Sequence, residues 1–495
     1  MRRPPRAGQR PAFVAVLEHN AGVTSVVIVG GGPGGYEAAH VAAQLGASVT
    51  LVDSDGMGGS AVLTDCVPSK ALIAVADGAR ATADNADLGV LVNGVPVDRD
   101  QVGVDLAAVN ERIQRLAQAQ SLDVAGRLRD AGVRLVTGYG RLAGPHTVLV
   151  SETPSDPAVT ESSVPVVAEL PADVVLLATG ARPRILPTAA PDGERILTWE
   201  QLYGLRDVPE HLIVVGSGVT GAEFASAYRG LGSEVTLVSS REHVLPGEDS
   251  DAAGVIEDVF ARRGITVLSG SRASAAARTD DGSAVVVTLS DGRELVASHC
   301  LMAVGSVPNT ETLGLATADV RCDDGGFIEV DRVSRTSARG IYAAGDCTGL
   351  LMLASVAAMQ GRIAMWHALG DAVTPLNLQT VSSNVFTTPE LATVGVTERD
   401  VVEGRINAEE VMLPLATNAR AKMSNFTDGF VKLFARTGTR IIVGGVVVAP
   451  QASELIHSIA LAVDMRLTVD EVAHAFTVYP SLSGSIAESA RLLHT

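Results

Sequence analysis

Three consecutive segments near the N-terminus decide the fold: VVIV at 26–29, GGGPGG at 30–35 and YEAAHVAA at 36–43. The first is a short apolar run that predicts a buried strand, and the last is an alanine-rich run that predicts a helix. The glycines between them, Gly30, Gly32 and Gly35, fit the spacing G-x-G-x-x-G. Such a turn brings bare backbone and the N–H groups of a helix N-terminus close to a pyrophosphate. We therefore expect a dinucleotide to bind here.

A second apolar run, SVTLV at 48–52, leads into Asp53, which lies 23 residues after Gly30. An acid at this distance can accept a hydrogen bond from a ribose 2′-hydroxyl. Strand, glycine turn, helix and acid together predict a Rossmann-like unit. We interpret it as the site for the adenine ribose of FAD.

The same arrangement recurs further along the chain. LIVV at 212–215 precedes Gly216, Gly218 and Gly221, and EVTLV at 234–238 precedes Ser239, again 23 residues after the first glycine. The acid is replaced by Ser239 and, two residues later, Arg241. A hydroxyl and a guanidinium favour a 2′-phosphate over a free hydroxyl. This second unit predicts a nicotinamide nucleotide site, with NADPH preferred to NADH, although Arg241 could also be an ordinary solvated charge.

Composition limits the class of protein. A chain of 495 residues corresponds to about three domains. The net charge of −18 argues against nucleic acid or an anionic membrane as a partner. Four cysteines without metal-ligand or paired spacing argue against a disulfide-stapled secreted protein and for the cytoplasm. We expect no metal site, no integral membrane segment and a disordered extension at residues 1–23.

Further motifs make the chain resemble the pyridine nucleotide–disulfide oxidoreductases, which include lipoamide dehydrogenase and glutathione reductase. They are VVLLATGARP at 174–183, AVGSVPNT at 303–310, GIYAAGD at 340–346 and VFTTPELATVG at 385–395. The resemblance covers nearly the whole chain from about residue 23. It implies an α/β fold with two Rossmann-like dinucleotide-binding domains and an α+β C-terminal dimerisation domain.

The resemblance also implies domain limits and roles for individual residues. The FAD-binding domain would comprise residues 24–186 and 303–372, the NAD(P)-binding domain 187–302 and the interface domain 373–495. Lys70 and Glu223 would form an ion pair beside flavin N5. Further FAD contacts are implied at Gly59, Thr179, Gly180, Gly345, Asp346 and Ala354, and further NAD(P) contacts at Glu223 and Gly305. Ala354 would lie at the start of a helix whose N-terminus faces the flavin.

The chain departs from the family pattern where the family carries its redox disulfide. The family pattern is G-G-x-C-x-x-x-x-C-[IV]-P-S-K, and here the segment reads GGSAVLTDCVPSK at 58–70. Cys66 matches the second cysteine, but Ala61 replaces the first. One thiol cannot perform dithiol–disulfide exchange on its own. We therefore expect the disulfide half of the family's chemistry to be absent.

The C-terminus departs from the family in the same direction. The family motif H-P-T-x-S-E supplies a catalytic His and Glu across the dimer, whereas this chain reads YPSLSG at 479–484. Tyr479 replaces the histidine and cannot act as a thiol base at neutral pH. His474 and Glu488 are out of register and are expected to be ordinary helix residues.

We expect an NAD(P)H:quinone oxidoreductase, a homodimer in which reduced flavin passes electrons directly to a quinone and Tyr479 forms an aromatic wall of the acceptor pocket. Packing at the dimer interface is the alternative role for Tyr479. A soluble transhydrogenase, a disulfide reductase resembling dihydrolipoamide dehydrogenase and an inactive FAD-binding scaffold remain alternative functions. Family members that lack the disulfide and the His–Glu pair are similar to quinone reductases, which favours the first interpretation.

Overall fold

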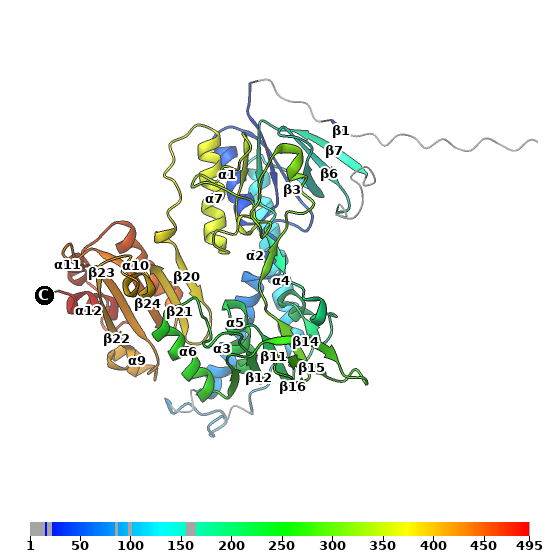
Figure 1. Ribbon diagram of the computed structural model, residues 1–495. Coiled ribbons are helices and arrows are strands. Elements are labelled where there is room, and N and C mark those ends of the chain that lie inside the picture. Colours follow the sequence, from blue (N-terminus) through cyan, green and yellow to red (C-terminus); the bar gives the residue numbers. More distant parts are fainter. Residues whose placement is uncertain (1–14, 17–21, 85–87, 98–100, 155–164, 495) are drawn as a thin grey trace, which may run out of the picture. The chain divides into compact units, whose positions relative to one another are not determined.

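The computed structural model describes residues 15–16, 22–84, 88–97, 101–154 and 165–494 (Figure 1). Most of the extension predicted at residues 1–23 lies outside these residues. By its contacts the chain forms two compact units. Unit 1 comprises Met1–Leu63, Ala117–Arg182 and Ser306–Leu376, and unit 2 comprises Thr64–Leu116, Pro183–Gly305 and Asn377–Thr495.

A five-stranded parallel sheet in the order β19-β8-β2-β3-β4 forms the centre of unit 1. Its strands are β2 (Ser25–Val29), β3 (Ser48–Asp53), β4 (Arg134–Thr137), β8 (Val174–Leu177) and β19 (Ile341–Ala343). Strands β2 and β8 inside the sheet are nearly continuous runs of Val, Ile and Leu, as expected for strands buried on both faces. Strands β2 and β3 and the helix after Gly32 match the first predicted unit, which is thereby confirmed.

Helices α1 (Pro33–Gln44) and α7 (Ala354–Ala368) pack side by side in unit 1 (Figure 1). Glycine permits this close approach, because a Cβ at Gly361 would lie 2.0 Å from the carbonyl oxygen of Gly34. Val26 and Ile28 of β2 point into the core with α1, while Val27 and Val29 pack in a second core. The second core includes a sheet of β5 (Tyr139–Leu142), β6 (Thr147–Ser151) and β7 (Val166–Pro171), with β1 (Ala15–Val16) at its edge.

Unit 2 contains a second five-stranded parallel sheet, in the order β10-β17-β11-β12-β13. Its strands are β10 (Ile196–Leu197), β11 (His211–Val215), β12 (Glu234–Val238), β13 (Ile265–Leu268) and β17 (His299–Met302). Helices α5 (Val219–Leu231) and α6 (Ser250–Arg262) pack on it. An antiparallel sheet of β14 (Ala273–Arg278), β15 (Val285–Leu289) and β16 (Glu294–Ala297) adjoins it. The second predicted nucleotide-binding unit is therefore also confirmed.

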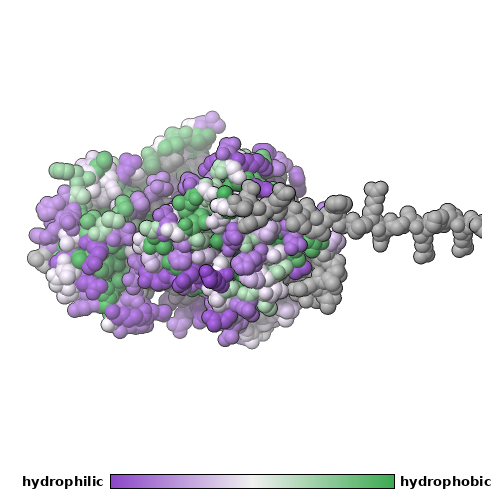
Figure 2. Space-filling view, turned by 90° about the horizontal axis from the view of Figure 1, so that it is seen from above, coloured by the Kyte–Doolittle hydropathy of each residue, from purple (hydrophilic) through white to green (hydrophobic). Residues whose placement is uncertain are grey.

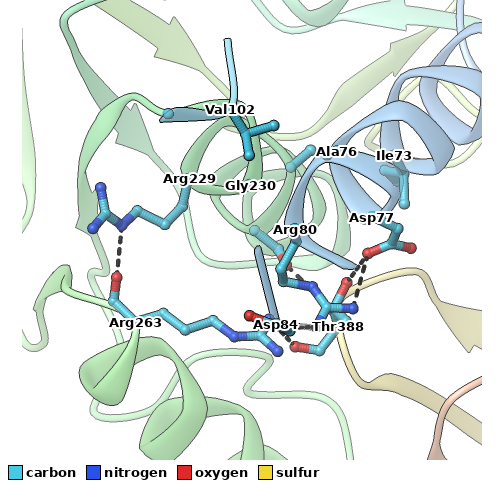
Figure 3. Close-up of a pocket in the computed structure, with 13 residues that line it drawn as sticks. Ile73, Ala76, Asp77, Arg80, Asp84, Val102, Arg229, Gly230, Arg263 and Thr388 are labelled. Atoms are coloured by element: carbon cyan, nitrogen blue, oxygen red, sulfur yellow. Dashed lines mark hydrogen bonds and ion pairs between the residues drawn. The ribbon is translucent and has the colours of Figure 1, made fainter. Parts of the chain in front are cut away.

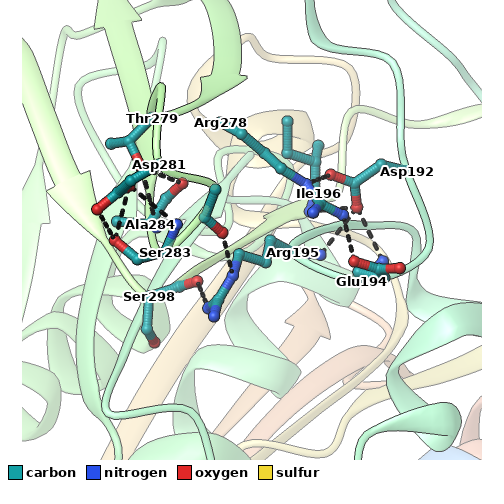
Figure 4. A network of polar contacts seen from close by, with 11 residues as sticks. Asp192, Glu194, Arg195, Ile196, Arg278, Thr279, Asp281, Ser283, Ala284 and Ser298 are labelled. Carbon is teal, nitrogen blue, oxygen red and sulfur yellow. Dashed lines mark hydrogen bonds and ion pairs between the residues drawn. The ribbon is translucent and has the colours of Figure 1, made fainter.

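A polar network ties the segment before β10 to strand β14 (Figure 4). Arg278 donates to the carboxylates of Asp192 and Glu194 at 2.6 and 2.7 Å. Partial burial would raise the pKa of Asp192, but the bonds from Arg278 and from the backbone N–H groups of residues 194–196 lower it far below the ordinary value. Asp192 therefore stays ionised and holds this turn in place.

Residues 64–116 pack within unit 2, although the sequence assigned them to the FAD-binding domain. Helix α3 (Cys66–Asp84) lies against α5, and Leu72, Ile73 and Ala76 share a core with Phe224 and Tyr228. The following helix, α4 (Leu106–Asp130), has Ile113 in the same core and Leu128 in a core of unit 1.

The C-terminal part of unit 2 is an antiparallel sheet in the order β20-β21-β24-β23-β22. Its strands are β20 (Ser382–Val385), β21 (Glu390–Gly395), β22 (Ala408–Pro414), β23 (Phe430–Arg436) and β24 (Ile442–Ala449). Helices α10 (Ala452–Asp464) and α12 (Gly484–Leu492) pack on it, and α11 (Val469–His474) packs on α12. Short helices α2 (Gly59–Leu63), α8 (Glu398–Val402) and α9 (Ala419–Met423) complete the described helices.

One helical stretch, Gly59–Asp84, is by length and composition apolar enough to cross a membrane. The mean hydropathy of its most apolar window is 1.3, and a third of that window is buried. A single stretch of this kind is weak evidence, because core helices of soluble proteins share the composition. Its apolar residues Leu72, Ile73 and Ala76 lie in the core of unit 2. Figure 2 shows a face on which hydrophilic residues are widespread, with smaller hydrophobic patches among them.

Candidate active site

The first glycine loop joins β2 to α1 and contains two positions, Gly30 and Gly35, where a side chain cannot fit. Gly30 has φ of +108°, and a Cβ there would lie 2.2 Å from the carbonyl oxygen of Ala178. A Cβ at Gly35 would lie 1.8 Å from the carbonyl oxygen of Gly30. Gly32 is the N-cap of α1, and no side chain caps it. The N–H groups of the first turn are therefore left for an anionic ligand.

Asp53 shapes this loop at the end of β3. Its Oδ2 accepts from the N–H of Gly31 at 2.6 Å, and its Oδ1 accepts from the N–H groups of Asp55 and Gly56. Burial raises the pKa of Asp53, although the three backbone N–H groups act to lower it. A Cβ at Gly59 would lie 2.7 Å from the Cα of Gly32, so Gly59 lies directly against the loop. The loop and the acid form a backbone cradle that fits a dinucleotide.

Two of the family motifs, VVLLATGARP at 174–183 and AVGSVPNT at 303–310, are joined by hydrogen bonds that we call the clasp. Thr179 Oγ1 donates to the carbonyl of Asn309 at 2.8 Å, and Asn309 Nδ2 donates to the carbonyl of Thr179 at 3.0 Å. The N–H of Asn309 also donates to the carbonyl of Gly180. Strands β9 (Ala181–Pro183) and β18 (Ser306–Pro308) pair beside the clasp. The predicted residues Thr179 and Gly180 thus lie at a hydrogen-bonded junction, and Asn309 is its other half.

The remaining predicted flavin contacts lie between β19 and α7. Gly345 has φ of +82°, and its N–H donates to Oε1 of Gln360 at 2.8 Å. Asp346 follows at the start of a short 3₁₀ helix (Asp346–Thr348), and Ala354 is the first residue of α7, whose N-cap has no side-chain cap. Gln360 is buried, and the sequence analysis did not identify it because nothing in the local pattern marks it.

The second glycine loop, between β11 and α5, repeats the first. Gly216 has φ of +112°, and a Cβ there would lie 2.2 Å from the carbonyl oxygen of Ala303. A Cβ at Gly221 would lie 1.8 Å from the carbonyl oxygen of Gly216. Gly218 is the N-cap of α5 without a capping side chain. Gly305, also predicted here, has φ of +93° and accepts from the N–H of Arg184.

Ser239 and Arg241 differ in their exposure. Ser239 is fully buried, and its hydroxyl is within hydrogen-bond distance of Ser217 Oγ at 2.7 Å and of the N–H and carbonyl of Arg241. It therefore orders the turn that carries Arg241. The Arg241 side chain is exposed, and its guanidinium has no hydrogen-bond or ion-pair partner within the described part of the chain. Of the two residues, only Arg241 presents a group to solvent.

Lys70 and Glu223, predicted as a pair, are in contact within unit 2. Lys70 Nζ donates to Glu223 Oε2 at 2.9 Å, and Glu223 is buried. Burial alone would lower the pKa of Lys70, but the Glu223 carboxylate raises it above the ordinary value. Phe386 completes the arrangement, because its N–H donates to Glu223 Oε1 at 2.9 Å and its ring lies 4.8 Å from Lys70 Nζ. Phe386 was expected only as part of the interface domain.

An acid and two further groups surround this ion pair. Burial raises the pKa of Asp65, with Lys70 lowering it and Glu223 raising it. Burial also raises the pKa of Tyr203, to which Asp65 adds, so Tyr203 stays neutral. Cys66 acts electrostatically on both Lys70 and Tyr203 and raises the pKa of each.

None of the four cysteines forms a disulfide. Burial raises the pKa of Cys300 to about 12 and that of Cys347 to about 11, so both thiols are protonated at neutral pH. His474 lies in α11 and contacts the carbonyl of Asp470, and Glu488 lies in α12 and pairs with Arg491. Both residues therefore lie in helices, as expected. Within the described residues, no group of three or more His, Cys, Asp or Glu could hold a metal ion.

Tyr479 lies between α11 and α12 with 86% of its surface exposed. Phe476 and Val478 beside it are exposed as well. Three adjoining exposed apolar side chains are typical of a surface that binds another molecule. The role of Tyr479 in the acceptor pocket, or alternatively at the dimer interface, stays a prediction.

Comparison with known proteins agrees with this geometry. The model of the family described as pyridine nucleotide-disulphide oxidoreductase matches residues 24–361, and that of its dimerisation domain matches residues 381–490. The chain is 54% identical over 474 residues to NAD(P)H dehydrogenase (quinone) of Mycobacterium tuberculosis, covering 95% of this chain and 94% of that protein. It is 34% identical over 471 residues to dihydrolipoyl dehydrogenase 2 of Haloarcula marismortui, covering 94% and 96%.

The crystal structure of LpdA from Mycobacterium tuberculosis superposes with a TM-score of 0.87 at 52% identity, covering 95% of this chain and all of that one. The likeness therefore extends over both units and both nucleotide-binding loops. The chain belongs to the pyridine nucleotide-disulphide oxidoreductase family, a family of oxidoreductases that use FAD and NAD(P)H.

Proposed function

We propose that this protein is an FAD-dependent NAD(P)H:quinone oxidoreductase. In the overall reaction, NAD(P)H and one proton reduce a quinone to a quinol and leave NAD(P)⁺. The flavin, when bound, takes the hydride from the nicotinamide and returns two electrons to the acceptor. The alternatives are transfer of hydride to a second nicotinamide nucleotide and reduction of a disulfide.

The observation that carries the proposal is the lone thiol beside an intact ion pair. Cys66 is the only cysteine in the 58–70 segment, and none of the four cysteines forms a disulfide. Reduction of a disulfide by exchange needs a second thiol to resolve the mixed disulfide. Lys70 and Glu223, which need no thiol, are paired at 2.9 Å. The 54% identity to a protein named NAD(P)H dehydrogenase (quinone) supports the same acceptor.

The chain's own groups have separable tasks in this proposal. The backbone cradles after β2 and β11 would hold the two pyrophosphates, and the N-terminus of α7, which has no side-chain cap, would face the flavin. Lys70 keeps a positive charge where electrons arrive, because Glu223 and Phe386 fix its position. Tyr479 contributes an aromatic face and a hydroxyl to the acceptor.

An acceptor panel tests the proposal. The FAD-loaded protein is reduced anaerobically with NADPH and mixed with a naphthoquinone, lipoamide, oxidised glutathione or thio-NAD. We expect kcat/KM for the quinone to exceed that for either disulfide by about two orders of magnitude or more, because no second thiol is available. Cys66→Ala is expected to retain quinone reduction.

Each other result of this panel contradicts the proposal in a defined way. A disulfide as the best acceptor would restore the disulfide reductase interpretation. Thio-NAD as the best acceptor would identify a transhydrogenase. Bound flavin that NADPH does not bleach would indicate an inactive scaffold.

Arg241 is proposed to select NADPH over NADH. In Arg241→Ala we expect the KM for NADPH to rise about 10- to 100-fold, because a charge-assisted bond to the 2′-phosphate is lost, while the KM for NADH changes little. Steady-state kinetics with both nucleotides measure the effect. Arg262→Ala, which removes an exposed arginine paired with Asp428, is the matched control. An equal change for both nucleotides would show that Arg241 does not read the 2′-phosphate.

We further propose that the chain acts as a homodimer through residues 373–495. The match to a dimerisation domain and the exposed Phe476, Val478 and Tyr479 support this assembly. The FAD-binding domain at 24–186 and 303–372 and the NAD(P)-binding domain at 187–302 are proposed with it. Four cysteines without a disulfide suit a reducing compartment, and we propose the cytoplasm.

A further inference from the structure

A cavity of about 460 Å³ lies within unit 2 (Figure 3). Its walls come from α3, from the C-terminal half of α5, from Arg263 after α6 and from Thr388 before β21. None of the residues predicted to bind FAD or NAD(P) lines it. Its volume is in the range of pockets that hold small ligands.

Two guanidinium groups lie together at this cavity. Figure 3 shows the side chains of Arg80 and Arg263 extending toward the same region, near Asp84 and Thr388. Arg80 pairs with Asp84 at 2.7 Å and with Asp77 at 3.6 Å. Arg263 Nη1 donates to the carbonyl of Thr388 at 2.6 Å. Burial and the positive charge of Arg80 lower the pKa of Arg263 to about 10.

At least one donor at this site has no acceptor among the described residues. Each guanidinium carries five N–H donors. Arg80 Nε is buried and has no hydrogen-bond partner among the described residues. Arg229, the third arginine, is committed elsewhere, because it donates to the carbonyls of Arg263 and Ser233 and so fixes the backbone that carries Arg263.

The charge balance favours an anion. Three arginines and two aspartates line the cavity, in a chain whose net charge is −18. Two neighbouring guanidiniums repel each other, and an anionic oxygen between them relieves that repulsion while accepting from the unused donors. Ile73, Ala76 and Ala227 give the cavity an apolar side.

We propose that this cavity binds a small organic anion, a phosphate monoester or a carboxylate attached to a compact apolar group. The proposal goes beyond the redox function and does not depend on it. The bound group contacts Arg80 and Arg263 through its oxygens and α3 and α5 through its apolar part.

The cavity shares its walls with the elements that hold the Lys70–Glu223 pair. Thr388 Oγ1 donates to Asp77 on α3, and the N–H of Thr388 donates to Ser226 Oγ on α5. Two residues earlier, the N–H of Phe386 binds Glu223. Arg80 lies about 15 Å along α3 from Lys70, at a rise of about 1.5 Å per residue. The site is therefore distinct from the ion pair, although it contacts the same elements.

Calorimetric titration of the FAD-loaded full chain tests the proposal. Phenyl phosphate, benzoate and phenol are titrated at constant ionic strength, with saturating NADP⁺ present so that the nucleotide site does not bind the probe. We expect phenyl phosphate or benzoate to bind at one site per chain and phenol not to bind. The two anions distinguish a phosphate site from a carboxylate site.

Single substitutions locate the bound anion. Arg80→Gln and Arg263→Gln are each expected to weaken binding by about tenfold or more, because each removes charge-assisted donors. Arg262→Gln removes the same charge one residue from Arg263 but outside the cavity, and it should change the affinity less than about twofold. If Arg263→Gln does not fold, Arg80→Lys decides, since it keeps the charge and removes the planar fork.

Three results would overturn the proposal. The first is that neither anion binds. The second is that phenol binds as tightly as the anions, and the third is that Arg262→Gln weakens binding as much as the cavity substitutions. Circular dichroism and the melting temperature of each variant separate lost binding from lost folding.

Discussion

In the Lys70→Met variant we expect anaerobic reduction of bound flavin by NADPH to slow by about 100-fold, because a positioned charge that stabilises the transition state is removed. The free energy of unfolding should fall by about 3 kcal/mol, because Glu223 would stay buried without its cation. Stopped-flow absorbance at the flavin band measures the first effect, and thermal or urea unfolding measures the second. Among the described residues, Phe386 alone would still donate to Glu223.

The double variant Lys70→Met/Glu223→Gln separates catalysis from stability. Neutral glutamine can still accept from the N–H of Phe386, so most of the lost stability should return while flavin reduction stays slow. Lys422→Met, on the exposed surface of α9, is the matched control and should change neither quantity. A reduction rate within threefold of the parent in Lys70→Met would make the ion pair purely structural. Failure of the double variant to regain stability would mean that the buried charge is not the cause.

An added methyl group should affect different properties at two glycines of the second loop: stability at Gly221 and nucleotide affinity at Gly218. Gly221→Ala should lower the free energy of unfolding by about 3 kcal/mol or more, because its Cβ would lie 1.8 Å from the carbonyl oxygen of Gly216 and force α5 away from β11. Gly218→Ala should fold normally, because its φ is −72° and nothing lies within 4 Å of the added Cβ. It should nevertheless weaken NADPH binding by about tenfold, since its methyl group occupies the space that the pyrophosphate approaches.

Unfolding curves and nucleotide titrations on both variants measure these effects. Gly216, the first glycine of the motif, needs no test of this kind because its φ of +112° already requires glycine. Equal stability of Gly218→Ala and Gly221→Ala would refute the steric argument. Unchanged NADPH affinity in Gly218→Ala would show that the nucleotide does not approach the backbone there.

Both nucleotide-binding units could be predicted because their signals are local. The strand β2, the glycine loop and α1 follow each other without interruption, and hydrophobic periodicity with glycine spacing reports such neighbouring residues. The same holds for β11, α5 and β12 and for the start of α7 at Ala354. Loss of the first thiol of the family motif could also be read directly, because Ala61 and Cys66 lie in one short segment.

Groups assembled from distant segments could not be found in this way. Phe386 reaches Glu223 across 163 residues, and Gln360 binds Gly345 from the next helix. Arg80 and Arg263 look like ordinary surface arginines in the sequence, and their shared cavity exists only after α3 and α5 have packed. Ser239 was expected to contact the nucleotide, but its buried hydroxyl binds the backbone of Arg241. The position of Ser239 at a strand end does not reveal this burial.

The amino-acid order alone determines the two dinucleotide loops and the missing dithiol, and it indicates Arg241 as a candidate for selecting the nucleotide. Each of these features depends on residues that are neighbours in the chain. Folding decides which charges meet and which are buried. Lys70 and Glu223 are 153 residues apart, and their side chains meet at 2.9 Å because α3 packs against α5. The packing of the segment before β21 places the Phe386 ring beside Lys70. The raised pKa of Lys70 depends on the same packing. Burial, desolvation and hydrogen bonding between distant segments are properties of the packed chain, so no local pattern encodes them.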